Sequence, residues 1–238
     1  METQFDQVAE TYDEGLEALL RPYTKGADTS RFAEYKVQLV HDILKKKKIR
    51  AVLDFGCGTG RSLAYFEKYF YDAKHLYGCD VSAESIKIAS EEVPQAQLFV
   101  NSSVEKFDQF FKGKGGYDLA FLACVLHHIE PQDRKEWMKA VVRNLKPGGC
   151  LAVFEHNLKN SYTKKIVSNP DNTVDDIHYM LTPKELYSLL LECSPKMSLV
   201  WKGYTMFSLF RPAWMTRAEQ GLKWCPLGAQ HCVIVWKR

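Results

Sequence analysis

The stretch VLDFGCGTGRS, residues 52–62, carries three glycines at alternate positions at the end of an apolar run. Gly56, Gly58 and Gly60 follow Asp54, the acidic residue that closes the run. Glycines at this density mark either turns that need positive φ angles or a ligand that approaches the main chain too closely for side chains. The rest of the sequence decides between these explanations.

The segments on both sides of this stretch alternate between strand and helix patterns. Apolar runs that predict strands stand at 49–56, 75–80, 97–101, 117–125 and 150–156. Amphipathic segments that predict helices stand between them at 62–70, 82–93 and 133–145. This alternation predicts an α/β fold, in which a doubly wound, mostly parallel sheet carries helices on both faces. The glycine stretch then lies at the sheet edge where doubly wound folds bind ligands.

Two nucleotide-binding motifs can be tested against the glycine spacing. The dinucleotide fingerprint G-x-G-x-x-G requires a third glycine at position 61 or 63, where the chain has Arg61 and Leu63. A phosphate-binding loop requires G-K-[ST] after the glycines, and the sequence has none there. Two explanations stay open: another ligand, or glycines that only let the strand and the helix pack closely.

The pattern D-x-G-x-G-x-G, residues 54–60, resembles the first motif of the class I S-adenosylmethionine (SAM)-dependent methyltransferases. The similarity covers roughly residues 45–156: Asp80 closes the second strand, VLHHI follows the fourth and LKPGG precedes the fifth. The resemblance implies a seven-stranded sheet of order 3-2-1-4-5-7-6, with an antiparallel last strand supplied by residues 231–238. It also implies SAM as the cofactor.

The resemblance assigns cofactor contacts to positions of this chain. Asp80 is expected to accept hydrogen bonds from both ribose hydroxyls, as one carboxylate can. Family members usually have Asp where this chain has Ser103, and a serine there makes a weaker contact with adenine. The expected cofactor-binding residues are Asp54, Gly56, Cys57, Gly58, Gly60, Asp80, Val81, Ser102, Ser103, Val104, Cys124 and Tyr12.

The chain ahead of the first strand is expected to form a helical cap, residues 1–49, on a cofactor-binding core, residues 50–156. Its segment FDQVAETYDEG resembles the start of small-molecule methyltransferases, in which such a helix closes over SAM. Tyr12 is the first expected contact and Phe5 the second; the alternative is that both rings only anchor the cap. Residues 157–238 complete this single domain with acceptor-side elements and a terminal hairpin.

Methyl transfer from SAM is an in-line displacement that depends on alignment, and an acceptor hydroxyl must also lose a proton. A nearby histidine is the usual base for that proton. Three histidines stand at expected strand ends: His127 and His128 after the fourth strand, and His156 after the fifth. His156 is the first candidate for the base and Glu155 the second. The alternative is that all three histidines are structural.

The polar segment 157–180 follows the fifth strand, at the edge where members of one fold differ in substrate. Asp175, Asp176, His178 and Tyr179 are expected to contribute to the acceptor site, with a surface loop as the alternative. The expected activity is methylation of a small molecule at oxygen, with a sugar or another metabolite as acceptor. A protein methyltransferase and a non-catalytic SAM-binding scaffold stay open as alternatives.

Composition argues against several other classes. The net charge of +3, together with the lack of N-P-P-Y at the fourth strand and of a basic stripe, disfavours nucleic acid as a substrate. No apolar run reaches the length of a membrane span. The seven cysteines include no C-x-x-C pair, so no metal site is expected, and free cysteines fit a reducing, cytoplasmic setting.

Overall fold

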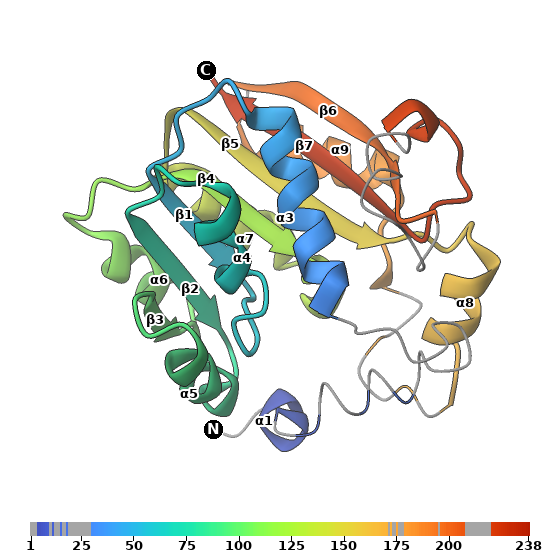
Figure 1. The fold of residues 1–238 in the computed structure, drawn as a ribbon, viewed down its shortest axis with the longest axis horizontal. Helices are drawn as coiled ribbons and strands as arrows, with labels where there is room; N and C mark the ends of the chain where they lie inside the picture. The colour runs from blue at the N-terminus through green and yellow to red at the C-terminus, as the bar shows by residue number, and fades with distance from the viewer. Residues whose placement is uncertain are drawn as a thin grey trace.

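The computed structural model describes residues 4–9, 11, 15, 18, 30–170, 172, 175, 179–194, 196–207 and 220–238. Its strands are β1 (Ala51–Phe55), β2 (His75–Asp80), β3 (Gln97–Val100), β4 (Tyr117–Ala123), β5 (Leu145–His156), β6 (Met197–Thr205) and β7 (Gln230–Lys237). These described strands form one sheet in the order β3-β2-β1-β4-β5-β7-β6 (Figure 1). β1 pairs in parallel with β2 and β4, whereas β7 runs antiparallel to β5 and β6. The expected strand order and the antiparallel last strand are confirmed.

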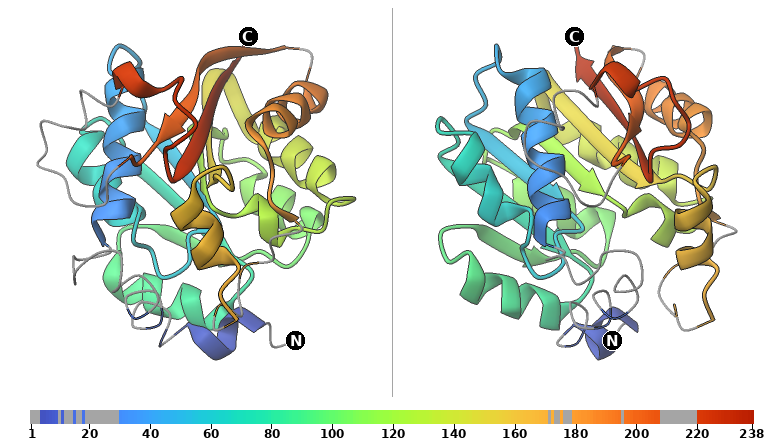
Figure 2. Two further views of the ribbon diagram at one scale, coloured as in Figure 1. Left: turned by 90° about the vertical axis from the view of Figure 1, so that its right-hand side faces the viewer. Right: turned by 45° about the vertical axis from the view of Figure 1, so that its right-hand side comes forward.

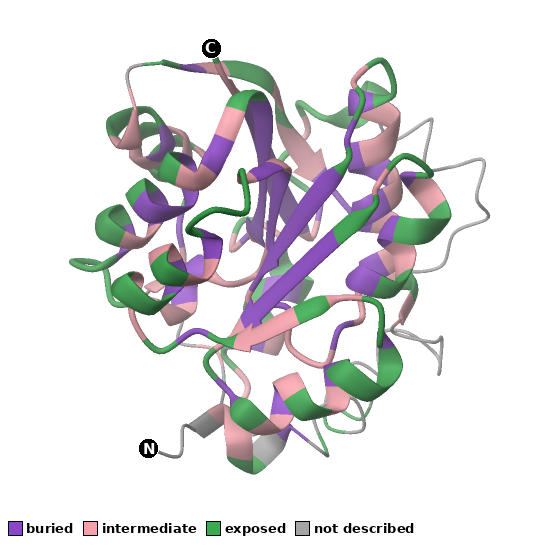
Figure 3. Cartoon of the chain, turned by 90° about the vertical axis from the view of Figure 1, so that its left-hand side faces the viewer, coloured by how far each residue is buried: buried purple, intermediate pink, exposed green. Residues whose placement is uncertain are grey.

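The central strands are continuous apolar runs because both faces of the sheet are covered. Val52 and Leu53 are neighbours in β1, so their side chains point to opposite faces. Both are fully buried, and each belongs to a different apolar cluster. Figure 3 shows the same burial along the middle of the sheet, with exposure concentrated on the outer sides of the helices.

Helices cover the two faces in sets that follow the chain order (Figures 1 and 2). One face carries α3 (Ser30–Leu44), α4 (Leu63–Tyr69) and α5 (Ala83–Glu92), and the other carries α6 (Val104–Phe111), α7 (Arg134–Asn144) and α9 (Pro183–Cys193). Phe66 of α4 and Phe107 of α6 are fully buried in the two clusters. Among the described residues, no helix has the length and apolar character to cross a bilayer.

Polar side chains fix where several helices begin. The Ser82 side chain accepts a hydrogen bond from the backbone N–H of Ser85 at 3.0 Å and caps α5. Thr182 and Glu185 form a complete capping box at the start of α9. Ser103 caps α6, because its hydroxyl accepts a hydrogen bond from the Lys106 backbone at 3.3 Å. These caps satisfy backbone donors that a helix start leaves unpaired.

The bounds of β5 and β6 differ most from those expected. β5 begins at Leu145, ahead of the turn residues at 146–149, because Leu145 already pairs with Tyr117 of β4 before the register shifts. The expected terminal hairpin is present as the antiparallel pair of β6 and β7, but β6 ends at Thr205, although the apolar run that predicts this strand extends over 198–210. The paired core of each strand agrees with the sequence pattern.

The ends of β1, β2, β4 and β5 meet at one edge of the sheet, hereafter the carboxyl edge, because these strands are parallel. Two short helices lie at this edge: α1 (Gln4–Val8) beside α5, and α8 (Ser161–Val167) beyond β5 (Figures 1 and 2). Asp6 of α1 accepts hydrogen bonds from the Ser82 hydroxyl at 2.8 Å and from the Glu84 backbone at 3.2 Å. The start of the chain is therefore fastened to the start of α5.

Candidate cofactor and acceptor site

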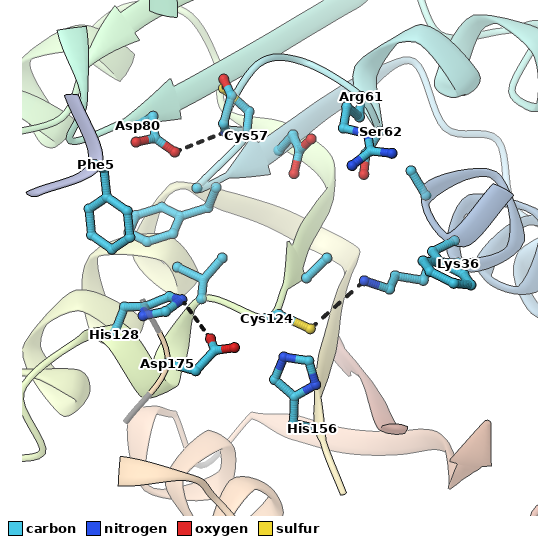
Figure 4. A pocket seen from close by; sticks show the side chains of 18 of the residues that line it. Phe5, Lys36, Cys57, Arg61, Ser62, Asp80, Cys124, His128, His156 and Asp175 are labelled. Carbon is cyan, nitrogen blue, oxygen red and sulfur yellow. Dashed lines mark hydrogen bonds and ion pairs between the residues drawn. The ribbon is translucent and has the colours of Figure 1, made fainter. Parts of the chain in front are cut away.

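A cavity of about 400 Å³ opens at the carboxyl edge (Figure 4). This volume lies within the range of small-molecule binding sites. The expected site residues that line it are Asp54, Gly56, Cys57, Gly58, Asp80, Val81, Cys124, His128 and His156, together with Phe5 and Asp175. Cys57 and Asp80 lie at one end, hereafter the glycine-loop end, and Cys124, His156 and Asp175 lie at the other, hereafter the histidine end. Gly58, Val81 and Asn101 also line the cavity.

The three glycines of the loop have different roles, although all have positive φ angles. A Cβ on Gly56 would stand 2.5 Å from Cγ2 of Val125, and a Cβ on Gly60 would stand 3.2 Å from Cβ of Ala89. These two glycines allow close packing of the loop against neighbouring elements. A Cβ on Gly58 would meet no described atom within 4 Å, and Gly58 lines the cavity. Gly60 does not line it.

Asp80 holds the loop in place. Its Oδ2 accepts a hydrogen bond from the Gly58 backbone at 2.9 Å, and its Oδ1 accepts one from the Ser82 backbone at 3.0 Å. Burial raises the pKa of this carboxyl, and the backbone hydrogen bonds act in the opposite direction. Each carboxylate oxygen has a second lone pair, so Asp80 can still accept hydrogen bonds from a ligand.

Asp54 lies in the wall of the cavity and is only 2% exposed. Its Oδ2 has no hydrogen-bond partner among the described residues. Burial, reinforced by the charge of Asp80, raises the pKa of Asp54 to about 8, and the charge of Lys36 acts against this rise. Buried polar atoms are normally satisfied, so this oxygen is a place for a ligand that donates a hydrogen bond.

Lys36 of α3 is a buried lysine that reaches into the cavity (Figure 4). Its ammonium donates to the thiol of Cys124 at 3.8 Å, and sulfur is a weak acceptor. A lysine is seldom buried without a strong acceptor. The position of its Nζ therefore favours an anionic group on the ligand. Sequence analysis missed this residue, although a lysine inside the buried stripe of Ala33, Val37 and Val40 was a visible signal.

Asn101 is a second residue that sequence analysis missed. It is 3% exposed, it lines the cavity, and its Oδ1 has no hydrogen-bond partner among the described residues. The three residues after it, Ser102, Ser103 and Val104, were expected to contact the cofactor, and they do not line the cavity. Ser103 instead caps α6, and Val104 packs against the apolar cluster beneath that helix. Asn101, the residue just before the three expected contacts, is therefore the one in this segment that lines the cavity.

The N-terminal cap contributes an aromatic ring to the cavity. The ring of Phe5 meets the ring of His128 edge to face, with 5.2 Å between their centroids. Ala9 lines the same wall. Phe5 of the expected cap thus lines the cavity, while Tyr12 lies outside the described residues.

His127 is a buried histidine held between two carboxylates. Its Nδ1 is 2.6 Å from Oε2 of Glu155, and its Nε2 is 3.0 Å from Oδ1 of Asp175. Burial would lower the pKa of His127, but the two carboxylates outweigh burial and raise it to about 10. His127 does not line the cavity. It is therefore charged at neutral pH and is not placed to take a proton from an acceptor, which favours the structural alternative for this residue.

His128 and His156 both line the cavity, with opposite protonation preferences. Burial, reinforced by the charge of His127, lowers the pKa of His128 to about 4. Burial would also lower the pKa of His156, but the neighbouring thiol of Cys124 outweighs it and the pKa is raised. Burial alone would raise the pKa of Cys124; His156 and Lys36 reverse the direction, so this pKa is lowered. At the histidine end, the imidazole of His156 and the thiol of Cys124 therefore each favour the charged form of the other.

The segment after β5 is fixed by asparagines. Asn157 is buried and donates to the carbonyl oxygens of Pro226 at 2.9 Å and Gly228 at 2.7 Å. This contact joins EHN of residues 155–157 to PLGAQ of residues 226–230 and leaves Asn157 outside the cavity lining. α8 follows, and Tyr162, Thr163, Ile166 and Val167 line the cavity. Of the expected acceptor residues, Asp175 lines the cavity and Tyr179 does not, while Asp176 and His178 lie outside the described residues.

Comparison with known proteins agrees with this geometry. A family model described as a methyltransferase domain matches residues 53–151. The chain is 29% identical to the tRNA (carboxymethyluridine(34)-5-O)-methyltransferase of Arabidopsis thaliana over 127 residues, which cover 52% of this chain and 28% of that protein. It is 26% identical to trans-aconitate 2-methyltransferase of Azoarcus sp. (strain BH72) over 126 residues, which cover 52% and 47% of the two chains. The chain thus spans less than half the length of either relative.

A solved structure extends the similarity to nearly the whole chain. The plantazolicin methyltransferase BamL, crystallised with a triazolic desmethylPZN analog and SAH (S-adenosylhomocysteine), superimposes with a TM-score of 0.67. The match covers 98% of this chain and 99% of that chain at 16% sequence identity, which establishes the shared fold. The domain model over residues 53–151, the shared fold and the glycine loop at the carboxyl edge all agree with the resemblance of this chain to the class I SAM-dependent methyltransferases.

Proposed function

We propose that this protein transfers the methyl group of SAM to an oxygen atom of a small molecule. The observation that carries the proposal is the cavity itself. Asp54, at the glycine loop, has a buried Oδ2 with no hydrogen-bond partner among the described residues, and the imidazole of His156 lies at the opposite end of the cavity (Figure 4). A methyl donor and an acceptor placed between these groups would meet in line, as a displacement at carbon requires.

The residues at the glycine-loop end fit the parts of SAM. The unpartnered oxygen of Asp54 suits the amino group of the methionine moiety, which donates hydrogen bonds and carries positive charge. Asp80 has lone pairs for the ribose hydroxyls, and the exposed side chain of Val81 offers an apolar surface beside it. Asn101 can accept a hydrogen bond from the adenine amino group through its unpartnered Oδ1. Asn101 thus takes the role that family resemblance gave to Ser103.

Lys36 completes this set as the partner of the methionine carboxylate. Its Nζ stands at 3.8 Å from the Cys124 thiol and interacts electrostatically with Asp54. An ammonium beside the site of an amino group and a carboxylate would pair with the carboxylate. Within the described parts of the chain, the Lys36 ammonium donates to the weakly accepting Cys124 thiol, so a buried lysine here gains much from an anionic ligand.

Lys36→Met should weaken SAH binding about 10–100-fold, the effect of removing one charged hydrogen bond. Binding of 5′-methylthioadenosine, which lacks both the carboxylate and the amino group, should be unchanged. Isothermal titration calorimetry with both ligands measures the difference, and Lys46→Met, at an exposed lysine, is the matched control. Equal losses for the two ligands would contradict the carboxylate assignment.

At the histidine end the reaction needs a group that assists loss of the acceptor proton. A C–O bond forms to the methyl carbon, the C–S bond of the sulfonium breaks, and the acceptor hydroxyl releases one proton, leaving SAH and a methyl ether or ester. His156 lines this end together with Asp175, and we assign the handling of that proton to this imidazole–carboxylate group. An oxygen acceptor explains why ionisable groups gather here, since a neutral amine needs no base before it attacks.

The size of the cavity supports a small acceptor. About 400 Å³ must contain the cofactor and the reacting part of the substrate together. α1 and α8 contribute side chains such as Phe5 and Tyr162 to its walls. The similarity to trans-aconitate 2-methyltransferase supports a small acceptor with oxygen groups, and the similarity to the tRNA enzyme covers a comparable share of this chain.

Calorimetry with SAH and NAD, followed by measurement of SAM conversion to SAH, tests the proposed function. We expect micromolar binding of SAH, no binding of NAD, and SAH production when hydroxylated or carboxylated metabolites are added. Binding without turnover on any member of a broad acceptor panel would favour a non-catalytic SAM-binding protein. Absence of SAH binding would remove the cofactor assignment as well.

His156→Gln should lower the rate of SAH production at least 100-fold, because removal of the group that handles the acceptor proton costs about that factor. The affinity for SAH should stay within about threefold, since His156 lies away from the glycine loop (Figure 4). Steady-state kinetics and calorimetry on the same preparation measure both quantities. His75→Gln, at an exposed histidine, is the control, and an unchanged rate in His156→Gln would remove this residue from the reaction.

A further inference from the structure

Three side chains at the histidine end converge from distant parts of the chain. His127 follows β4, His156 ends β5, and Asp175 lies beyond α8. One ligand atom from each, a ring nitrogen or a carboxylate oxygen, lies within 4.8 Å of the other two. Among the described residues this is the group of histidine, cysteine and acidic side chains that meets the geometry of a metal site.

The distances within the group suit coordination to one ion. Two ligand atoms that each stand about 2.1 Å from an ion lie roughly 3.0–3.4 Å apart in octahedral or tetrahedral geometry. Nε2 of His127 is 3.0 Å from Oδ1 of Asp175. The rings of His127 and His156 have their centroids 5.2 Å apart and are tilted by 54°. A ligand atom of His156 lies within 4.8 Å of those of His127 and Asp175, so the three side chains need only draw closer to hold one ion.

Two of the three side chains are already oriented by further hydrogen bonds. Glu155 is fully buried; its Oε1 accepts from the Leu126 backbone at 2.8 Å, and its Oε2 lies 2.6 Å from Nδ1 of His127. With Nδ1 engaged, Nε2 of His127 is the atom directed at Asp175. On the other side, the Asn172 amide donates to Oδ2 of Asp175 at 3.0 Å. A carboxylate behind a histidine is the arrangement that orients metal-binding imidazoles.

We propose that His127, His156 and Asp175 bind a divalent first-row transition-metal ion, such as Mn²⁺, Fe²⁺ or Zn²⁺, at the histidine end of the cavity. Two imidazoles and one carboxylate favour such ions over Mg²⁺ or Ca²⁺, which prefer oxygen ligands. The ion replaces the proton on Nε2 of His127 and converts its contact with Asp175 into shared coordination. The cysteine spacing gave no sign of this site, because its ligands are not cysteines.

The position of this centre deepens the proposed function and rests on it. Three protein ligands leave coordination positions open, and His156 and Asp175 line the cavity. An ion there acts as a Lewis acid that polarises an acceptor oxygen and eases the loss of its proton. His156 and Asp175 then assist loss of the acceptor proton through the ion that they hold, and the proton passes to water. An acceptor with two adjacent oxygens, such as a vicinal diol or a hydroxycarboxylate, fits two open positions.

Titration calorimetry of the metal-free full-length chain with MnCl2, ZnCl2 and MgCl2 tests the proposal. We expect one Mn²⁺ or Zn²⁺ per chain with micromolar affinity, and affinity for Mg²⁺ at least 100-fold weaker. Asp175→Asn and His156→Gln should each lower the affinity for Mn²⁺ at least 100-fold. Asp72→Asn and His75→Gln, which change an exposed carboxylate and an exposed histidine elsewhere, should leave it unchanged.

Titration of the same samples with SAH separates this proposal from the proposed function. A variant that still binds SAH is folded, so its loss of Mn²⁺ binding reports on the metal site. SAH binding without binding of Mn²⁺ or Zn²⁺ at millimolar concentration would overturn the metal site and leave the methyltransferase proposal standing. Equal Mn²⁺ affinity in Asp175→Asn and the unmodified protein would overturn it as well. Metal binding without SAH binding would instead remove the methyltransferase proposal.

Discussion

Gly58→Arg is expected to reduce the affinity for SAH at least 1000-fold while the protein stays folded. A Cβ on Gly58 meets no described atom within 4 Å, so the fold has room for a side chain there. That room is the cavity, and a guanidinium beside Asp54 and Asp80 would occupy the place of the ligand. Gly58 has a φ of +51°, where a non-glycine residue costs about 1–2 kcal/mol. The expected loss in Tm is therefore only a few degrees.

Two further glycine variants separate ligand exclusion from backbone strain. Gly113→Arg places arginine at an exposed glycine with a φ of +79° and no described atom near its Cβ. Its Tm should fall by about as much as that of Gly58→Arg, and its affinity for SAH should be unchanged. Gly56→Ala should lose far more stability, because its Cβ collides with Val125. Calorimetry and thermal unfolding measure both effects. If Gly58→Arg bound SAH within tenfold of the unmodified protein, the loop would not be the cofactor site.

Asp54→Asn is expected to stabilise the ligand-free protein and to weaken its binding of SAH. The pKa of Asp54 is raised to about 8 in the folded protein from an ordinary value of 3.8. The folded state therefore holds a proton that the unfolded chain releases between these values. The free energy of unfolding then falls by roughly 1.4 kcal/mol per pH unit as pH rises from about 4 to about 8, and levels off above it. Asparagine at position 54 does not ionise, so this pH dependence of the free energy of unfolding should be absent from Asp54→Asn.

Urea unfolding at pH 5 and pH 8 measures this effect. Asp54→Asn should raise the free energy of unfolding by about 3 kcal/mol more at pH 8 than at pH 5, and Asp72→Asn, at an exposed carboxylate, should show no such difference. The same change should weaken SAH binding about 10–100-fold, because a charged hydrogen bond to the amino group is lost. Equal stability changes at the two pH values would contradict the burial of an uncompensated carboxyl at this position.

Much of the fold could be predicted from the sequence because its signals are local. A continuous apolar run such as β1 can be buried on both faces only in a covered sheet. Ser82 and Thr182 mark helix starts because their side chains satisfy backbone donors within three residues. Gly58 and Asp80 were predicted to contact the cofactor because one motif and one strand end resemble those of a known family, and both residues line the cavity.

Other parts of the site could not be predicted, because contacts between distant segments decide them. Ser103 was expected at the cofactor from its place in a motif, but its hydroxyl forms a helix cap and Asn101 lines the cavity instead. His127 and His128 are adjacent in sequence and have opposite pKa shifts. The two carboxylates that decide this difference stand 28 and 48 residues after His127.

The sequence by itself determined the alternation of strands and helices and the glycine loop, because backbone conformation and apolar periodicity are properties of neighbouring residues. The strand order and the expected cofactor followed from the resemblance to a known family. Tertiary structure alone decided which buried polar atoms lack hydrogen-bond partners among the described residues, and which ionisable groups shift each other's pKa. Asp54 and Lys36 lie on β1 and α3, and only the packing of α3 against the sheet brings their charges into one cavity. Burial removes water from these groups, and their chemistry then depends on whichever distant residues the fold places beside them.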